Sequence, residues 1–261
     1  ILRGRFTNTI SYILPADLAN AAMSGTRIAN GIDIAAGIGT FSINNNSGTG
    51  LGISGGTMRI YDVCNTTASP LAYLVSCQVS NINVTGGTIE FIPTTGAGDA
   101  NFFINSRAPF YNFKVNRTAP SPSTVNLINN PLIVNNDLTV ASGVFNASSF
   151  DVTVGGNFSI ASGTTYGPVN NTTIFNGLNP QTLTVDLAAA QNLVNMTVDK
   201  PAGVALTIGG TQPVLNVTGN FRLLLGTLDD NGKTINITGN IYNSGLHSGA
   251  GKIVLNGTAL Q

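Results

Sequence analysis

Short runs in which apolar and polar residues alternate recur along the chain. Each run opens with an asparagine and closes on a glycine, and the spacings between openings are 157 − 136 = 21, 220 − 157 = 63 (three times 21) and 240 − 220 = 20. Alternation of this kind is typical of short, half-buried strands. The opening asparagines are Asn136, Asn157, Asn220 and Asn240, and the closing glycines are Gly143, Gly163, Gly226 and Gly245.

A fixed period of about 21 residues with one short strand per period predicts a parallel β-solenoid, in which each turn of the chain (a rung) stacks on the next. Alternate apolar residues, such as Leu138 with Val140 and Phe158 with Ile160, would point inward, and a spacing of ~4.8 Å between rungs would close a continuous core. Glycine would supply positive φ at the corners, and equivalent asparagines would form amide ladders up the stack. We therefore expect an all-β protein, a parallel β-helix with rungs of about 21 residues.

A longer period is superimposed on the first. Gly143 matches Gly226, and Asn157 matches Asn240, both at the same displacement (226 − 143 = 83 and 240 − 157 = 83). The segment 112–117 matches the segment 195–200 at this displacement too. Four rungs of about 21 residues would make one such unit, which we call the long repeat.

These periods suggest a division of the chain. Residues 15–23, with an early proline followed by small helix formers, are a candidate short helix that would cover the start of the ladder. We expect an irregular start or cap and then the solenoid, with two whole long repeats and one incomplete long repeat. The boundaries are 1–40 for the cap, 41–261 for the solenoid, and 48–130, 131–213 and 214–261 for the repeats.

Composition narrows the possible functions. Charged residues make up 8% of the 261 residues, and the 11 basic and 11 acidic side chains cancel. No net field would therefore attract nucleic acid or an anionic membrane, and no apolar run approaches the length of a membrane span. The polar surface must come from Asn, Thr and Ser, which suits an extracellular or cell-surface protein.

The chain has two cysteines, Cys64 and Cys77, and one histidine, His247, without a CxxC motif. This set does not provide a zinc site, and we expect no metal or cofactor. The cysteines could form a disulfide that closes one loop, as is common in oxidising compartments. Alternatively, both are small buried thiols.

Candidate catalytic residues are few. Parallel β-solenoids often carry polysaccharide lyases and hydrolases, which use paired carboxylates, and Asp137 and Asp151 could approach each other within one rung. Asp137, however, is typical of a turn residue, so no catalytic residue is assigned. Residues 229–232 resemble a calcium-binding cluster but lack the later glutamate, and they predict a tight turn. His247 is expected in an exposed loop.

Two surface roles also remain open. Glycosylation sequons begin at Asn65, Asn116, Asn216 and Asn236, although a chain this rich in Asn and Thr produces sequons by composition. A flat threonine face for ice binding would need threonine at the same place on every rung, and Arg222 and Tyr242 interrupt the column.

Residues 219–261 contain Gly-Asn-apolar, Gly-Thr-Leu-Asp-Asp-Asn-Gly-Lys-Thr-Ile and Leu-Asn-Gly-Thr-Ala-Leu-Gln. This segment resembles repeats in very large secreted surface proteins of Bacteroidota, including gliding-motility adhesins and other cargo of the type IX secretion system. The resemblance covers residues 131–261 well and 80–130 weakly. It implies export, surface attachment and a structural or adhesive role, and it transfers no catalytic residue.

The sequence thus favours a non-enzymatic stalk or adhesin segment, in which the ladder provides length and the loops provide contacts. The expected partners are further rungs or domains of the same long chain, surface glycans, or the secretion and attachment machinery. The alternative is a β-helix module that binds or degrades carbohydrate.

Overall fold

The computed structural model describes residues 50–60, 71–92, 101–117 and 124–258, together with the strands Arg27–Ile28, Ile32–Asp33 and Phe41–Ile43. The chain forms two compact units. The first comprises residues 1–133 and 142–146, and the second comprises residues 134–141 and 147–261. Among the described residues, strands and their turns make up the fold, and the one helical element is a 3₁₀ turn, η2 (Val79–Asn81). The candidate helix at 15–23 and Cys64 lie outside the described residues.

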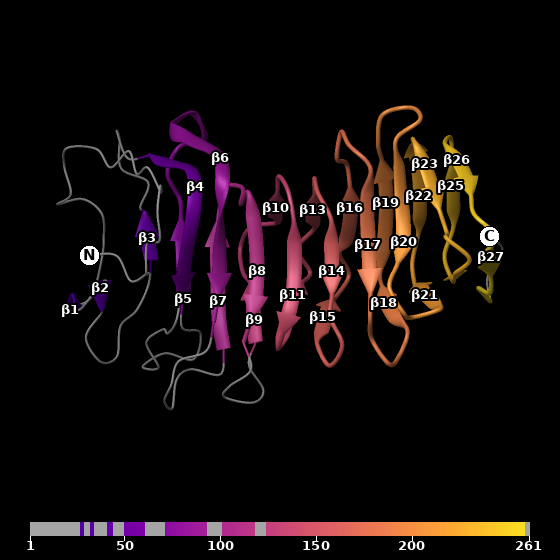
Figure 1. Cartoon of the computed structure of the whole chain (residues 1–261), viewed down its shortest axis with the longest axis horizontal. Coiled ribbons are helices and arrows are strands. Elements are labelled where there is room, and N and C mark those ends of the chain that lie inside the picture. The colour runs from indigo at the N-terminus through magenta and orange to yellow at the C-terminus, as the bar shows by residue number, and fades with distance from the viewer. Residues whose placement is uncertain are drawn as a thin grey trace. The chain divides into compact units, whose positions relative to one another are not determined.

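The first unit contains two stacks of parallel strands and a short antiparallel pair, β1 with β2. In one stack β4 pairs with β6 and β6 with β8; in the other, β3, β5, β7 and β9 follow in order (Figure 1). The strand β12 (Val144–Ser148) then pairs with β9. Between residues paired in the parallel stacks, the chain advances by 20 (Thr124 to Val144) to 32 (Phe41 to Tyr73). The strand bounds are β1 (Arg27–Ile28), β2 (Ile32–Asp33), β3 (Phe41–Ile43), β4 (Leu51–Ile60), β5 (Leu71–Val75), β6 (Ile82–Phe91), β7 (Asn101–Ser106), β8 (Asn112–Asn116) and β9 (Thr124–Leu127).

Buried aromatic rings fill the core of the first unit. Tyr73 and Phe110 lie with ring centroids 5.1 Å apart, and Phe110 meets Phe113 edge-on at 5.1 Å. Phe113 also packs against Phe91 and Phe145 at 5.4 and 5.3 Å. Such contacts add to the free energy gained by burying the rings themselves.

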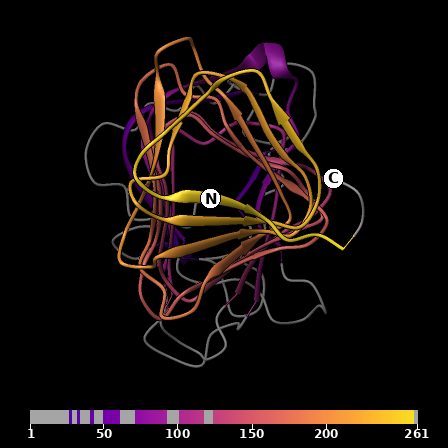
Figure 2. The ribbon, with the colours of Figure 1, turned by 90° about the vertical axis from the view of Figure 1, so that its right-hand side faces the viewer.

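The second unit is a regular parallel β-solenoid in which every rung supplies three strands. Seen end-on, strands of successive rungs lie one behind another on three sides (Figure 2). We call these sides face 1 (β13, β16, β19, β22, β25), face 2 (β11, β14, β17, β20, β23, β26) and face 3 (β18, β21, β24, β27). The prediction of one strand per period was therefore wrong, because every corner of the rung separates two strands.

The strands of the second unit are short. Three strands, β10 (Leu132–Val134), β11 (Leu138–Ser142) and β12 (Val144–Ser148), include residues of both units. The bounds of the others are β13 (Val152–Val154), β14 (Phe158–Ile160), β15 (Thr165–Pro168), β16 (Thr172–Phe175), β17 (Gln181–Val185), β18 (Gln191–Leu193), β19 (Asn195–Asp199), β20 (Ala205–Gly209), β21 (Val214–Val217), β22 (Phe221–Leu225), β23 (Thr227–Asp229), β24 (Thr234–Ile237), β25 (Ile241–Asn243), β26 (Leu246–Ser248) and β27 (Lys252–Leu255).

The register explains the hydrophobic pattern. Leu138 stacks on Phe158, which stacks on Leu183, and all three side chains are completely buried. The chain advances by 158 − 138 = 20 in the first step and by 183 − 158 = 25 in the second, so the turns differ in length while the register is kept. Because side chains alternate along a strand, the residues between these inward positions point outward. The parallel β-solenoid predicted from the sequence is confirmed.

The long repeat does not correspond to four whole rungs. It carries β11 and β14 of face 2 onto β22 and β25 of face 1, eleven strands further along (138 to 221 and 158 to 241). It also carries β13 of face 1 onto β24 of face 3. Eleven strands are two strands more than three rungs, which gives a rung of about 23 residues (83 × 3/11), close to the period expected of a solenoid. Equivalent sequences therefore occupy different faces.

Glycines allow the close approach of neighbouring corners. Gly239 N donates a hydrogen bond of 3.0 Å to Gly219 O, and a Cβ added at Gly239 would collide with that oxygen. We expect Gly239→Ala to lower the free energy of unfolding by about 1–3 kcal/mol, because backbone rather than a movable side chain occupies the space. Urea titration would measure this, with Ser244→Ala at an exposed position as the control. Equal stability of the two variants would contradict the proposed close packing.

Candidate functional site

The corner that leads into face 1 carries a ladder of asparagines. Asn220 N donates to Asn195 Oδ1 at 2.9 Å, and Asn240 N donates to Asn220 Oδ1 at 3.0 Å. Asp151 Oδ1 accepts the backbone N–H of Thr172 in the same column at 2.7 Å. The bonds run from backbone to side chain, whereas the sequence predicted a ladder between amide side chains.

The corner that leads into face 2 is built in the same way. Asp137 Oδ1 accepts a hydrogen bond of 2.8 Å from Asn157 N, and Asn157 Oδ1 accepts one of 2.9 Å from Thr182 N. Asn136 lies one residue before this column, where its carbonyl accepts the N–H of Gly156 at 2.7 Å. Asn157 therefore belongs to a different corner from Asn220 and Asn240, although the sequence aligned all three.

The four closing glycines divide into two kinds. Gly143, Gly163 and Gly226 have φ of 80°, 74° and 82°, a conformation that favours glycine. Gly245 does not have a positive φ; instead, a Cβ added there would lie 2.7 Å from the carbonyl oxygen of Gly226 on the rung before. It is a site of close approach between rungs.

A ladder between amide side chains does exist, on face 3. Asn236 Nδ2 donates to Asn216 Oδ1 at 2.9 Å, and Asn216 Nδ2 donates to Asn192 Oδ1 at 2.7 Å. Two of these residues begin glycosylation sequons, and their amide nitrogens serve as the donors of this ladder. The sequence pattern did not reveal it, because the three asparagines lie 24 and 20 residues apart in the middle of strands.

The carboxylates considered for catalysis belong to the corner ladders. Asp137 lies before β11 of face 2 and Asp151 before β13 of face 1, and each holds a backbone N–H of the following rung.

Residues 229–232 form a tight turn, in which Asn231 and Gly232 have φ of 50° and 78° and Lys233 N donates to Asp230 O at 2.9 Å. Within the described part of the chain, no three His, Cys, Asp or Glu side chains cluster as metal ligands would. No described helix has the length and apolar character needed to cross a membrane.

His247 has an acidic neighbour, which the sequence did not predict. Its Nε2 lies 2.7 Å from Oδ2 of the fully buried Asp230. Asp230 Oδ1 also accepts the N–H groups of Gly232 and Gly251 at 2.9 and 2.7 Å. Burial alone would raise the pKa of Asp230, but the hydrogen bonds from the two glycines and from His247 outweigh it and lower the pKa.

The first unit contains a charged cluster that spans three rungs. Glu90, which is 5% exposed, stacks between Arg59 and Lys114, with Nε···Oε2 at 2.9 Å and Nζ···Oε1 at 3.0 Å. Asn116 Nδ2 donates to the same carboxylate at 3.0 Å. Burial would raise the pKa of Glu90, but these three donors outweigh it and lower the pKa.

Two buried cations occupy matching places in the long repeat. Lys200 and Arg117 are each 1% exposed. Lys200 Nζ donates to Gly177 O, Asn179 O and Gln181 Oε1 at 2.9, 2.9 and 2.6 Å. Arg117 Nη1 donates to a backbone carbonyl at 3.1 Å, and its guanidinium lies 3.5 Å from the centroid of the Phe102 ring. Strand alternation could have identified both, because each comes two residues after an inward valine.

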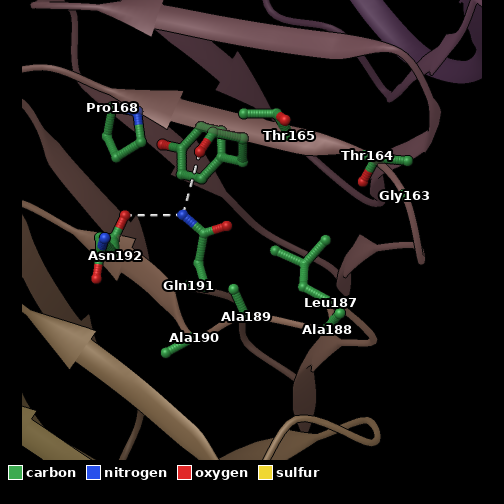
Figure 3. A pocket seen from close by; sticks show the side chains of 11 residues that line it. Gly163, Thr164, Thr165, Pro168, Leu187, Ala188, Ala189, Ala190, Gln191 and Asn192 are labelled. Atoms are coloured by element: carbon green, nitrogen blue, oxygen red, sulfur yellow. Dashed lines mark hydrogen bonds between the residues drawn. The ribbon is translucent and has the colours of Figure 1, made fainter.

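The second unit also has an open hollow of about 570 Å³ (Figure 3). It lies beside β15 and β18, and the segment between β17 and β18 forms one wall. Gln191, which is 4% exposed, donates through Nε2 to the carbonyl oxygens of Tyr166 and Asn192 at 3.1 and 2.7 Å. The sequence did not predict this site, because the hollow depends on the length of the segment between β17 and β18 and not on a recognisable motif. The lining residues are Gly163, Thr164, Thr165, Tyr166, Pro168, Leu187, Ala188, Ala189, Ala190, Gln191 and Asn192.

Cys77 is buried, and burial raises the pKa of its thiol. Its thiol is free among the described residues, while Cys64 lies outside them. The predicted disulfide stays a prediction.

Stability should depend on pH through Lys200, because burial lowers its pKa to about 8. The unfolded chain holds this proton up to about pH 10.4. Between these values the unfolded state binds more protons, so stability rises with pH across the interval, and below it Lys200 contributes no pH dependence. Between about pH 8 and 10.4, we expect the free energy of unfolding of the wild type to rise by at most about 3 kcal/mol relative to that of Lys200→Met, and by less to the extent that solvent and the three acceptors of Nζ stabilise the charged amine.

Urea unfolding across this pH range would measure the difference. Lys233→Met is the matched control, since Lys233 Nζ also donates to a carbonyl, that of Gly210 at 2.6 Å, from a half-exposed position. A wild-type advantage over Lys200→Met that does not change with pH would contradict the prediction.

Comparison with known proteins gives no further assignment: no family model, no curated protein and no solved structure matches this chain. What the geometry establishes is the fold, a parallel β-solenoid whose polar side chains join one rung to the next.

Proposed function

We propose that this chain is a non-enzymatic structural and adhesive segment of a secreted or cell-surface protein. Stacked rungs supply length, at ~4.8 Å per rung, and loops at the corners supply contacts. Its partners would be further rungs or domains of the same long chain, surface glycans, or the machinery of secretion and attachment.

The observation that carries the proposal is that acidic and amide side chains hydrogen-bond one rung to the next. Asp137, Asp151 and Asp186 each accept a backbone N–H from the following rung, at 2.7 to 2.8 Å. A catalytic pair of carboxylates faces each other across the scissile bond, whereas Asp137 and Asp151 lie at different corners, before β11 of face 2 and before β13 of face 1. Here the carboxylates serve the cohesion of the stack, which supports a structural function.

A deletion of one rung tests whether the solenoid can be shortened by a whole rung and still fold. Removal of residues 195–219 would place Asn220 where Asn195 stands, because these two residues occupy the same column. We expect cooperative unfolding to be retained and a spin-label distance between positions 162 and 248 to shorten by about 4.8 Å. Both native cysteines would be replaced by serine in all samples.

The control is a deletion of equal length out of register. Removal of residues 205–229 would bring Asp230 to the place of Ala205, where the register requires Thr227. An offset of three residues turns inward side chains outward, so this variant should fail to unfold cooperatively. If both deletions behave alike, the rungs are not modular and the stalk function loses its support.

Turnover tests the non-enzymatic part directly. The wild type should release no reducing ends from a panel of polysaccharides. Release that disappears in Asp137→Ala or Asp151→Ala would contradict the proposal.

A further inference from the structure

The backbone ladder on the third side of the second unit is interrupted at the hollow. β18, β21, β24 and β27 form one continuous sheet, but β15, from the rung before β18, belongs to a different sheet. The Gln191 side chain spans the interruption, because its Nε2 donates to Tyr166 O in the place of a backbone N–H. The hollow is therefore a local opening between two rungs that are otherwise held together.

Polar groups with complementary roles meet at this opening. The amide ladder of face 3 runs from Asn236 through Asn216 to Asn192, so the Nδ2 group of Asn192 is its donor end. Successive amides polarise one another, which strengthens the terminal donor. Gln191 supplies the acceptor: its Nε2 is engaged by two carbonyls, while in Figure 3 its oxygen points away from them, toward the side of Leu187.

The remaining lining suits a neutral ligand with both hydroxyl and C–H surfaces. Thr165 adds an exposed hydroxyl, and Ala188, Ala189 and Pro168 add small apolar surfaces. None of the lining residues is charged. The volume lies in the range of small-molecule sites, roughly 300–1,000 Å³.

We propose that this hollow binds a neutral sugar unit of a polysaccharide, with Asn192 Nδ2 donating to a sugar oxygen and Gln191 Oε1 accepting from a sugar hydroxyl. The proposal rests on the adhesive part of the proposed function and names the ligand class for one contact. An acidic sugar is disfavoured, because the lining contains no cation to balance its carboxylate. An added peptide strand is also disfavoured, because β15 and β18 are close enough for one glutamine side chain to bridge them.

Isothermal titration of the full chain with neutral oligosaccharides of glucose, mannose and xylose tests the proposal. Oligogalacturonate serves as the charged probe, and an extended threonine-rich peptide as the probe for strand addition. We expect binding of at least one neutral oligosaccharide and of neither other probe. Ala189→Phe, which fills the hollow, should weaken that binding at least tenfold, as should Asn192→Ala.

Matched controls separate the site from general effects. Ala202→Phe places the same ring on an exposed turn outside the hollow, and Asn256→Ala removes an exposed amide that belongs neither to the hollow nor to the ladder. Both should bind nearly as the wild type does. Ala189 is exposed, so its variant should fold normally, and unfolding by urea would verify this.

Three results would overturn the inference: no binding of any neutral oligosaccharide at millimolar concentration, equal binding by Ala189→Phe and the wild type, or preference for oligogalacturonate or the peptide. None of them affects the stacked-rung function, which the rung deletion tests separately.

Discussion

When Phe158 stacks on Leu138 and Leu183 stacks on Phe158, each rung of the second unit covers the apolar side chains of the rung before it. One rung has too few inward residues to form a core, so burial and backbone pairing arise only between rungs. A shift of one residue in register would turn the inward set toward solvent. The other features of this unit, including its ladders and glycine corners, follow from the need to keep that register.

In-register stacking also explains why so few residues are charged. Equivalent side chains on neighbouring rungs lie about 5 Å apart, so a column of like charges would repel along its whole length. Asparagine avoids this, because its Oδ1 accepts a hydrogen bond from one rung while its Nδ2 donates to another, as in the column from Asn192 to Asn236. The charged column described in the first unit alternates in sign, from Arg59 through Glu90 to Lys114.

The sequence predicted the parallel stack because Gly-Asn openings and alternating apolar residues recur at nearly constant spacing. It did not predict three strands per rung, since all three faces accept the same triplet of an inward, an outward and an inward residue. Val152–Val154, Phe158–Ile160 and Gln191–Leu193 follow this pattern on three different sides. A pattern common to all faces cannot indicate which face a strand occupies.

The polar interior was equally hard to predict. Lys200 is held by Gly177, Asn179 and Gln181, which come from the rung before it, 19 to 23 residues earlier in the chain. Its inward direction follows from strand alternation, but its acceptors depend on how the turn after β16 folds. Gln191 presents the same problem, since its partner Tyr166 lies 25 residues away across the interrupted ladder.

The rotation of the long repeat from face to face limits what the surface can do. A surface that binds a crystalline ligand such as ice needs the same side chain at the same place on every rung. A sequence repeat that spans a whole number of rungs would provide such a surface. Here the repeat moves Thr139 of β11 on face 2 to Arg222 of β22 on face 1. Repetition therefore preserves the inward residues, which every face needs, while it distributes the outward residues around the stack. We therefore expect a contact site on such a surface, like the hollow beside Gln191, to be a local feature of neighbouring rungs rather than one member of a regular array.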